Sequence, residues 1–574
     1  MTETYTMSVD DMESGGIASQ LSLEGTSKAS GDQACSRILL AAMIVCLVYA
    51  VIVGRLIYLG ASELEPSSGR AYSNISTSAS RPDIVDRNGE LLATDIVTSS
   101  LFAEPRRIVD ADEAVELLST VLPNLDVRKV HQRLASKAAF VWLKRELTPK
   151  VQSEILALGI PGIGFRRETK RFYPKGVTGS HLIGYVDIDN VGIAGIEKYL
   201  EKRSLKDLRE AGFTRNATLE PVKLSIDTRV QHFVRDELAK AMERYQAIGA
   251  AAVVLNIHTG EVVGMASLPD FNSNSPKDAQ KKGRFNRMTA GLYEMGSTFK
   301  TFTTAMALDS GLVNIDSRFD ATKPLRIAGH TINDFHAKRR VLSVPEVFIY
   351  SSNIGTAKMA DVVGIKGHRE FLHRIGLLEK LEFELPGVRM PNEPKKWKKI
   401  NSVTISYGHG VQTTPLHTAV AAAALMNGGI LIPPTILPRT EEQAAAIGKR
   451  VVKEDTSRLM RYLMRLNVLK GSGRRAEVPG FRVGGKTGTA EKVVNGRYSS
   501  KVRFNSFVAA FPMDDPQYIV LSIIDEPKPE AGKKSATAGL NAAPIVRNII
   551  RRSAPILGIQ PKFGSKELPL YVRN

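Results

Sequence analysis

Three short groups of polar residues occur in an order that suits serine acyl-transfer chemistry. Ser297 and Lys300 lie three residues apart at the start of a helical run that ends near Gly311, so both side chains face the same side. A neutral amine beside a hydroxyl can remove the hydroxyl proton when burial or nearby positive charge keeps the amine unprotonated. Taken alone, Ser-x-x-Lys is a weak signal, because a chain of 574 residues contains a few by chance.

The second group is Ser351-Ser352-Asn353, about fifty residues later, at the start of another helical segment. Serine or asparagine at this place is often only a helix N-cap. A functional interpretation makes Ser351 a proton relay and Asn353 an amide donor. The third group, Lys486-Thr487-Gly488, follows well beyond. The order and spacing of the three groups favour an acyl-transfer site more than any one of them does.

The third group also fits a nucleotide site. Residues 480–487 match the P-loop pattern Gly-x-x-x-x-Gly-Lys-Thr, and "YIVLSIIDE" at 518–526 is similar to a strand ending in a metal-binding acid. A P-loop follows a buried strand and begins a helix, whereas the polar, turn-rich "KGSGRRAEVPG" precedes this one and Gly488 is a poor first helical residue. We therefore expect a strand over "FRVGGKTGTAEKVV", a core strand at 518–526, and no nucleotide.

Two other clusters were weighed as binding sites. "GHTINDFH" offers His330, Asp334 and His336, but zinc needs three or four convergent ligands and the chain has no His-Glu-x-x-His helix. A loop histidine pair is favoured, with no metal. "PKKWKKIN" at 394–401 interleaves tryptophan with lysines, as nucleic-acid or membrane-surface patches do. A solvated loop is the commoner explanation, and no nucleic acid is expected.

Charge is unevenly distributed along the chain. The formal net charge is +19, and residues 1–37 hold six acids against two bases, so the remainder carries +23. Such a body suits nucleic acid, anionic lipid or cell-wall polymer, with a solvated basic surface as an equal alternative. The two cysteines are Cys35 and Cys46. A disulfide framework, a cysteine zinc site and a cysteine nucleophile are therefore excluded beyond residue 46.

One apolar segment indicates the compartment. Residues 38–53 are uncharged, and the apolar character extends to Gly60 if Arg55 snorkels to the interface. A cleaved signal peptide is the alternative, but the segment is longer than an h-region and a polar tail precedes it. We expect a transmembrane anchor at 37–59, a disordered cytoplasmic tail at 1–36, and the body outside the cytoplasm.

The pattern of predicted strands and helices divides the chain after the anchor into two domains. Residues 60–220 mix short β-like runs with turns such as Asn88-Gly89, whereas 221–565 alternate helical and strand segments. Residues 229–245 have helical periodicity, and 250–267 predict two strands around a Thr259-Gly260 turn.

In these motifs and in its domain order, the chain resembles the class B penicillin-binding proteins, which are monofunctional peptidoglycan transpeptidases. "RPDIVDRNGELLATD", "RFYPKGVTGSHLIGYV" and "GIAGIEKYLE" are similar to the family's pedestal motifs. "LSIDTRVQ", "FNRMTAGLYEMGSTFK", "SYGHGVQTTPLHTAVAAAALMNGG" and "VGGKTGTAEK" are similar to transpeptidase blocks. Two residues depart from the pattern: Pro82 stands where glycine is usual, and Met295 where proline usually precedes the nucleophile's Gly-Ser. Met295 puts the rigidity of that turn in doubt.

The resemblance implies an α+β fold. Its expected parts are the anchor helix, an elongated, mainly β pedestal (non-penicillin-binding) domain, and a transpeptidase domain with a mixed sheet flanked by helices, as in serine β-lactamases. It also implies catalytic roles for five residues: Ser297 as acyl-ester nucleophile, Lys300 as general base, Ser351 as proton relay, Asn353 as holder of the peptide amide, and Lys486 as a source of positive field.

Substrate binding is implied for Thr487, Gly488 and Thr489, and the backbone N–H groups of Ser297 and Thr489 would form the oxyanion hole. No metal or organic cofactor is implied. Stem peptides, the lipid-linked precursor and β-lactams are the implied ligands.

Within the family, "LYEMGSTFK", "SSNIGTAKMA" and "SYGHG" resemble the septal, division enzyme more than the elongation enzyme. The expected location is the inner membrane, single-pass, with the catalytic domain in the periplasm. A membrane-embedded glycosyltransferase and other divisome proteins are the expected partners. Three alternatives stay open: an elongation-type transpeptidase, a β-lactamase or carboxypeptidase, and a largely structural divisome scaffold.

Overall fold

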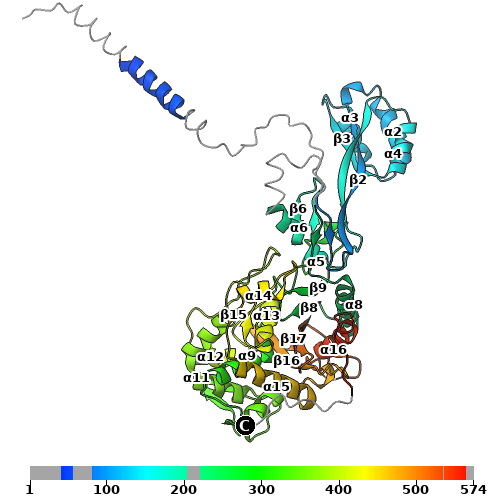
Figure 1. The fold of residues 1–574 in the computed structure, drawn as a ribbon. Coiled ribbons are helices and arrows are strands. Elements are labelled where there is room, and N and C mark those ends of the chain that lie inside the picture. The colour runs from blue at the N-terminus through cyan, green and yellow to red at the C-terminus, as the bar shows by residue number, and fades with distance from the viewer. Residues whose placement is uncertain (1–39, 56–80, 203–219, 495, 534, 564–574) are drawn as a thin grey trace, which may run out of the picture. The chain divides into compact units, whose positions relative to one another are not determined.

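The computed structural model describes residues 40–55, 81–202, 220–494, 496–533 and 535–563 (Figure 1). Residues 1–75 and 76–574 are separate units, and each is described by itself. In the first unit, residues 40–55 form a helix whose residues are exposed. The predicted tail and both ends of the predicted anchor lie outside the described residues. In the part of the chain that is described, no helix is long and apolar enough to cross a membrane.

The first sheet of the second unit is built on a long central strand. Its strands are β1 (Ile84–Val85), β2 (Leu91–Ala103), β3 (Val141–Leu147), β4 (Ile163–Phe172) and β7 (Val222–Lys223). β2 pairs antiparallel with β1, β3 and β4, and β1 pairs in parallel with β7. The predicted turn at Asn88-Gly89 joins β1 to β2, with Gly89 at a φ of 86° that glycine adopts without strain.

Helices between these strands correct the prediction of a mainly β pedestal. They are α2 (Ala111–Val121), α3 (Val127–Leu134) and α4 (Pro149–Ala157). The side chains of Asp110, Asp126 and Thr148 cap their first turns. Apolar residues at helical spacing, such as Val115 and Leu118 of α2, share one buried core with Leu101 of β2. The pedestal is therefore α+β, because the strands alone would leave the core uncovered.

After β4 the chain forms short helices and strands, in the segments that resemble the later pedestal motifs. They are α5 (Ser180–Ile183), β5 (Tyr185–Val186), β6 (Gly192–Ala194) and α6 (Gly195–Leu200). Gly184 and Gly195 are in close contact, since a Cβ on Gly195 would lie 2.4 Å from the Gly184 nitrogen. Both residues must be glycine for β5 and β6 to meet.

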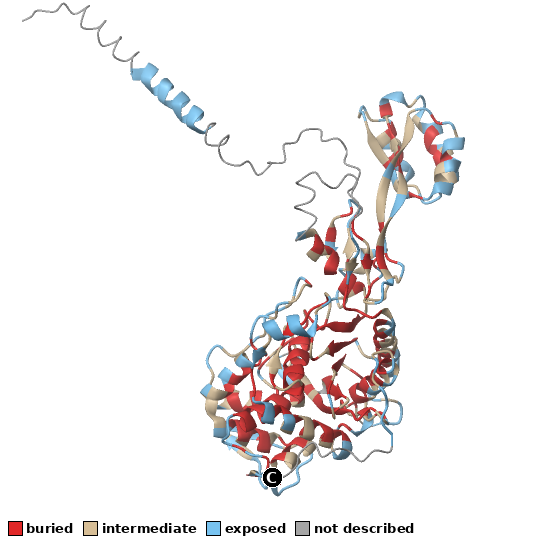
Figure 2. Ribbon diagram, viewed as in Figure 1, coloured by how far each residue is buried: buried red, intermediate tan, exposed pale blue. Residues whose placement is uncertain are grey.

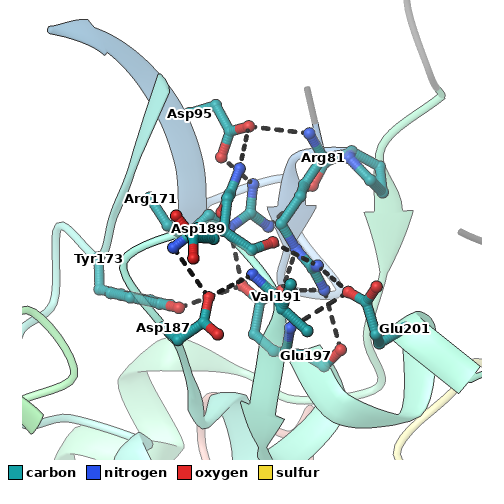
Figure 3. Close-up of polar contacts among 12 residues, drawn as sticks. Arg81, Asp95, Arg171, Tyr173, Asp187, Asp189, Val191, Glu197 and Glu201 are labelled. Atoms are coloured by element: carbon teal, nitrogen blue, oxygen red, sulfur yellow. Dashed lines mark hydrogen bonds and ion pairs between the residues drawn. The ribbon is translucent and has the colours of Figure 1, made fainter. Parts of the chain in front are cut away.

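Three sequence blocks that resemble pedestal motifs meet in one buried charge network (Figure 3). Arg81 donates to Glu197 at 2.9 Å and also pairs with Glu201. Arg171 donates to Glu197 at 2.7 Å and pairs with Asp95 at 3.1 Å. The side chains of Arg81, Arg171 and Glu197 are fully buried. Buried charges persist only when paired, so the three motifs form a single structural cluster.

The second sheet is the scaffold of the larger domain. Its strands, in spatial order, are β16 (Gly484–Val494), β17 (Arg497–Phe511), β18 (Tyr518–Asp525), β8 (Gly249–Asn256) and β9 (Val262–Leu268). All four pairings are antiparallel. Parallel pairing occurs beside this sheet, at the single bridge between Glu261 and Thr435 next to β9, and in the first sheet between β1 and β7. The strands predicted within 250–267, 481–494 and 518–526 are confirmed, although the second begins only at Gly484.

Helices cover both faces of this sheet, as predicted (Figures 1 and 2). On one face lie α8 (Thr228–Tyr245) and α16 (Ala542–Ser553). On the other lie α9 (Lys300–Asp309), α11 (Asn353–Arg374), α13 (Pro415–Met426) and α15 (Glu454–Lys470). Alternate residues of β8 enter the two cores: Ala252 and Val254 face the first, Ala251 and Val253 the second. β18 is buried along its whole length, which makes 518–525 a core strand.

The remaining elements are short. They are η1 (Pro105–Arg107), η4 (Pro276–Asp278), η5 (Gly296–Phe299), β10 (Arg318–Asp320), β11 (Leu325–Ile327), β12 (His330–Ile332), β13 (Val341–Ser343), α10 (Val344–Tyr350), α12 (Lys399–Ser406), β14 (Ile430–Leu431), α14 (Glu441–Ile447), β15 (Lys449–Arg450) and η6 (Arg474–Ala476). Most of them belong to the face of the second sheet that carries α9 and α11.

The charge network makes Glu197 essential to the pedestal. Glu197→Ala leaves two buried guanidinium groups without their shared carboxylate, and we expect a loss of about 3–5 kcal/mol in the free energy of unfolding. Lys150→Ala is the matched control, because it removes an exposed pair with Glu154 that contributes below about 1 kcal/mol. Urea denaturation of both variants measures the difference. Equal stability of the two variants would contradict the assignment.

Candidate active site

The turn that carries Ser297 lies against the edge of the second sheet. Ser297 is in η5, directly before α9, and is half-buried. Gly296 has a φ of 54°, and a Cβ there would lie 2.8 Å from the Thr489 carbonyl oxygen on β16. Glycine is therefore required at 296, both by its conformation and by the close approach of the two backbones. Within the described residues the Ser297 hydroxyl makes no hydrogen bond.

Met295 holds this turn by other means than a proline ring. Its φ of −78° is within the range of proline, and its side chain is fully buried. Its carbonyl accepts hydrogen bonds from Thr298 Oγ1 at 2.6 Å and Ser506 Oγ at 3.4 Å. The backbone before Ser297 is thereby fixed to both η5 and β17, so the turn is held in place although the proline is missing.

Two buried lysines share one hydroxyl. Lys300 Nζ donates to Ser351 Oγ at 3.1 Å and to the Ser351 carbonyl, and Lys486 Nζ donates to Ser351 Oγ at 2.9 Å. Lys300 is 1% exposed and Lys486 0%. The structure therefore brings together Lys300, Ser351 and Lys486, which lie on three different segments of the chain.

Burial and mutual repulsion disfavour the charged form of these amines. Burial lowers the pKa of Lys300 well below its usual value, and Lys486 lowers it further, while Asp334 raises it. Burial lowers the pKa of Lys486 to about 7. Both effects favour the neutral form of Lys300, which is the state that a general base needs.

The Ser351-Ser352-Asn353 corner serves both as a helix cap and as part of the site. Ser351 ends α10 in the left-handed region, with a φ of 56°. Ser352 is the N-cap of α11, and its Oγ accepts from the Gly355 N–H at 3.0 Å. Asn353 donates from Nδ2 to the Asn333 carbonyl at 2.9 Å. The capping and functional interpretations are compatible, because adjacent residues carry them.

Asp334 is a positioning residue that the sequence did not identify as such. Its carboxylate accepts from Ser352 Oγ at 2.7 Å and from the Ile354 N–H at 3.0 Å. It therefore fixes the corner that presents Ser351 to the lysines. His330 and His336 are exposed. Among the described residues, no group of three or more metal-ligating side chains could hold an ion.

The third motif, Lys486-Thr487-Gly488, lies on the edge strand of the second sheet and does not form a P-loop. Residues 484–494 form β16, with Lys486 paired to Val508 and Thr489 to Asn505 of β17. A Cβ on Gly488 would lie 2.4 Å from the Met295 carbonyl oxygen. Glycine at 488 therefore lets the strand contact the turn before Ser297. The helix that a phosphate site requires after Lys486 does not form.

The threonines of this strand have protein partners. Thr487 Oγ1 is 2.7 Å from Ser472 Oγ, and Thr489 Oγ1 accepts from the Ala538 N–H at 3.1 Å. Thr487 is 7% exposed, whereas Thr489 is half-buried. These contacts fix both side chains beside the lysine pair.

The lysine pair predicts a coupled titration. Lys486→Met removes a positive charge beside Lys300, so the pKa of Lys300 should rise toward its usual value while burial keeps it below. The pH dependence of the ¹³Cε NMR signals of isotopically labelled lysines measures this. Lys358→Met is the control, since Lys358 donates to the Asp320 carbonyl and should leave the Lys300 signal unchanged. An unshifted Lys300 titration in Lys486→Met would contradict the coupling.

Comparison with known proteins assigns the family. The penicillin binding protein transpeptidase domain matches residues 250–551, and the penicillin-binding protein dimerisation domain matches 76–209. A probable peptidoglycan D,D-transpeptidase FtsI of Caulobacter vibrioides is 41% identical over 493 residues, covering 84% of this chain and 82% of that protein. The peptidoglycan D,D-transpeptidase FtsI of Escherichia coli is 31% identical, covering 84% and 85%.

A solved structure agrees in fold. A peptidoglycan synthetase from Bifidobacterium adolescentis superposes with a TM-score of 0.66 at 21% identity, covering 86% of this chain and 98% of that one. At this identity the likeness shows the fold alone. The two domain matches and the relatives, together with the lysine–serine cluster, show that the chain belongs to the class B penicillin-binding proteins.

Proposed function

We propose that the chain is a peptidoglycan D,D-transpeptidase of the septal, FtsI-like type, acting through an acyl-enzyme on Ser297. The observation that carries this proposal is the position of the Ser351 hydroxyl between the amines of Lys300 and Lys486. This arrangement offers a neutral amine to remove a proton and a hydroxyl to relay one. The names of the FtsI relatives support the choice of substrate.

Acylation uses the residues of the nucleophile turn. Lys300 takes the Ser297 proton, and Oγ attacks the carbonyl of the penultimate D-Ala of a donor stem peptide. The backbone N–H groups of Ser297 and Thr489 stabilise the oxyanion. The close approach of Gly296 to Thr489 supports this pairing, because it places both backbones at one point. The C–N bond then breaks, and the leaving D-Ala amine takes a proton through Ser351.

Donor binding uses the strand edge and the corner of α11. Thr487, Gly488 and Thr489 bind the terminal carboxylate, assisted by the positive field of Lys486. Asn353 holds a peptide amide after exchanging its bond to the Asn333 carbonyl. β-Lactams mimic the D-Ala-D-Ala end and acylate Ser297 without a departing group, which blocks the site. The acyl-enzyme is normally resolved by an amine of a second stem peptide.

The proposed location and partners follow from the N-terminal segment and from the relatives. Residues 38–53 are uncharged and apolar, which supports a single-pass anchor with the body in the periplasm. The septal assignment implies a membrane-embedded glycosyltransferase and other divisome proteins as partners. An elongation-type transpeptidase is the alternative within the family.

Labelling with fluorescent penicillin tests the nucleophile and the reaction class. The wild-type chain should form a stable covalent adduct, Ser297→Ala none, and the control Ser310→Ala the same adduct as wild type, since Ser310 is exposed at the end of α9. Gel fluorescence measures all three. A label that decays within minutes would indicate a β-lactamase, and an unlabelled wild type a scaffold. Covalent labelling of Ser297→Ala would overturn the nucleophile assignment.

Cell shape tests the septal assignment. Cells whose only copy carries Ser297→Ala should grow as filaments, because septal cross-linking stops while elongation continues. Light microscopy after depletion of the wild-type protein measures cell length. Round cells would instead assign the chain to elongation.

A further inference from the structure

A second set of side chains lies beside the nucleophile turn, and the mechanism above does not use it. Glu294, three residues before Ser297, accepts hydrogen bonds from the Gly410 N–H at 2.9 Å and from the Tyr498 hydroxyl at 3.0 Å. Tyr498 belongs to β17 and Gly410 to the loop after α12. One carboxylate therefore joins the nucleophile turn, this loop and the strand hairpin.

The loop of residues 407–410 packs directly on the nucleophile turn. Gly408 has a φ of 87°, and a Cβ there would lie 2.1 Å from the Gly296 carbonyl oxygen. No side chain fits between the two backbones. His409 follows at once, so its position is fixed relative to Ser297 by backbone contact.

The imidazole of His409 lies between two tyrosine rings. Its ring packs edge-on against Tyr498, with centroids 5.7 Å apart, and lies tilted against Tyr407 at 5.4 Å. The side chain is half-buried. Its Nδ1 is buried, and the Tyr407 backbone is a hydrogen-bonding neighbour of the ring.

The surroundings of His409 favour its neutral form. Burial lowers the pKa of His409, and nearby Lys300 lowers it too, while Glu294, Glu491 and a hydrogen bond with the Tyr407 backbone raise it. The imidazole is therefore neutral at physiological pH. Tyr407 and Tyr498 also face the ring and stay protonated, because burial raises the pKa of both hydroxyls.

We propose that His409, framed by Glu294 and Tyr498, forms the subsite for the acceptor amine, and that its imidazole takes a proton from that amine before attack. This inference rests on the proposed transpeptidase function. The donor's carboxylate would then bind at Lys486 and the threonines of β16, and the acceptor's ammonium beside Glu294 and Glu491.

In this step a primary amine of a second stem peptide attacks the acyl-enzyme. The amine enters as R–NH₃⁺ and gives one proton to His409. The lone pair of the amine nitrogen then attacks the ester carbonyl, and the C–Oγ bond to Ser297 breaks. A second proton of the amine passes to Oγ through Lys300. An amide and a free serine result, and His409 releases its proton to solvent. No oxidant, metal or further reactant is needed.

Partition of the acyl-enzyme tests the proposal. The purified full-length protein is given a thioester donor ending in a D-alanyl group, with free D-alanine as the amine, and aminolysis is measured relative to hydrolysis. His409→Gln should lower this ratio about a hundredfold, the lower end of the contribution of a general base. Its aminolysis should also rise with pH as free amine forms. His258→Gln is the matched control and should keep the wild-type ratio.

The KM for D-alanine in Glu294→Gln is a second measurement, and a purely structural role of Glu294 would not change it selectively. The substitution keeps an acceptor for Gly410 and Tyr498 but removes the charge, so the KM for D-alanine should rise severalfold with a smaller change in kcat. An unchanged partition ratio in His409→Gln, or equal losses of aminolysis and penicillin acylation, would overturn the proposal. If His409→Gln fails to fold, Glu294→Gln decides: an unchanged KM overturns the subsite. Absence of acylation in the wild type would instead refute the proposed function.

Discussion

The chemistry of this site depends on two amines that share one hydroxyl in a dry environment. Two ammonium groups hydrogen-bonded to the same oxygen repel each other, and burial removes the water that would otherwise stabilise them. The pKa of Lys300 is lowered for both reasons. The site therefore favours a neutral Lys300 amine, and the elements that carry Lys300, Ser351 and Lys486 bring these three side chains together.

The scaffold achieves this by bringing together distant parts of the chain. Lys300 begins a helix packed on the sheet, Ser351 ends a different helix in a left-handed turn, and Lys486 lies on the edge strand. Asp334 holds the Ser351 corner through Ser352. Because each partner belongs to a separate element, the geometry exists only in the complete fold and not in any local motif.

This explains which features the sequence could predict. Ser297, Lys300, Ser351 and Lys486 belong to short motifs with fixed local spacing, and the strand and helix assignments around them follow from periodicity. The sequence indicates Asp334 only as a candidate metal ligand. Its contact with Ser352 depends on the tertiary fold, so no local pattern predicts its positioning role. The pedestal helices were missed because their strands gave the stronger signal, although Asp110 and Asp126 are recognisable caps. The role of His409 depends on contacts that no pattern of spacing records.

The backbone contacts around Ser297 also constrain how the protein can change over time. Gly296, Gly408 and Gly488 each face a carbonyl oxygen at a distance that excludes a Cβ. Substitution at any of them would push the strand or the loop away from the nucleophile. These three positions therefore tolerate no larger residue, whereas Tyr498, which is half exposed, can change without moving the backbone around Ser297.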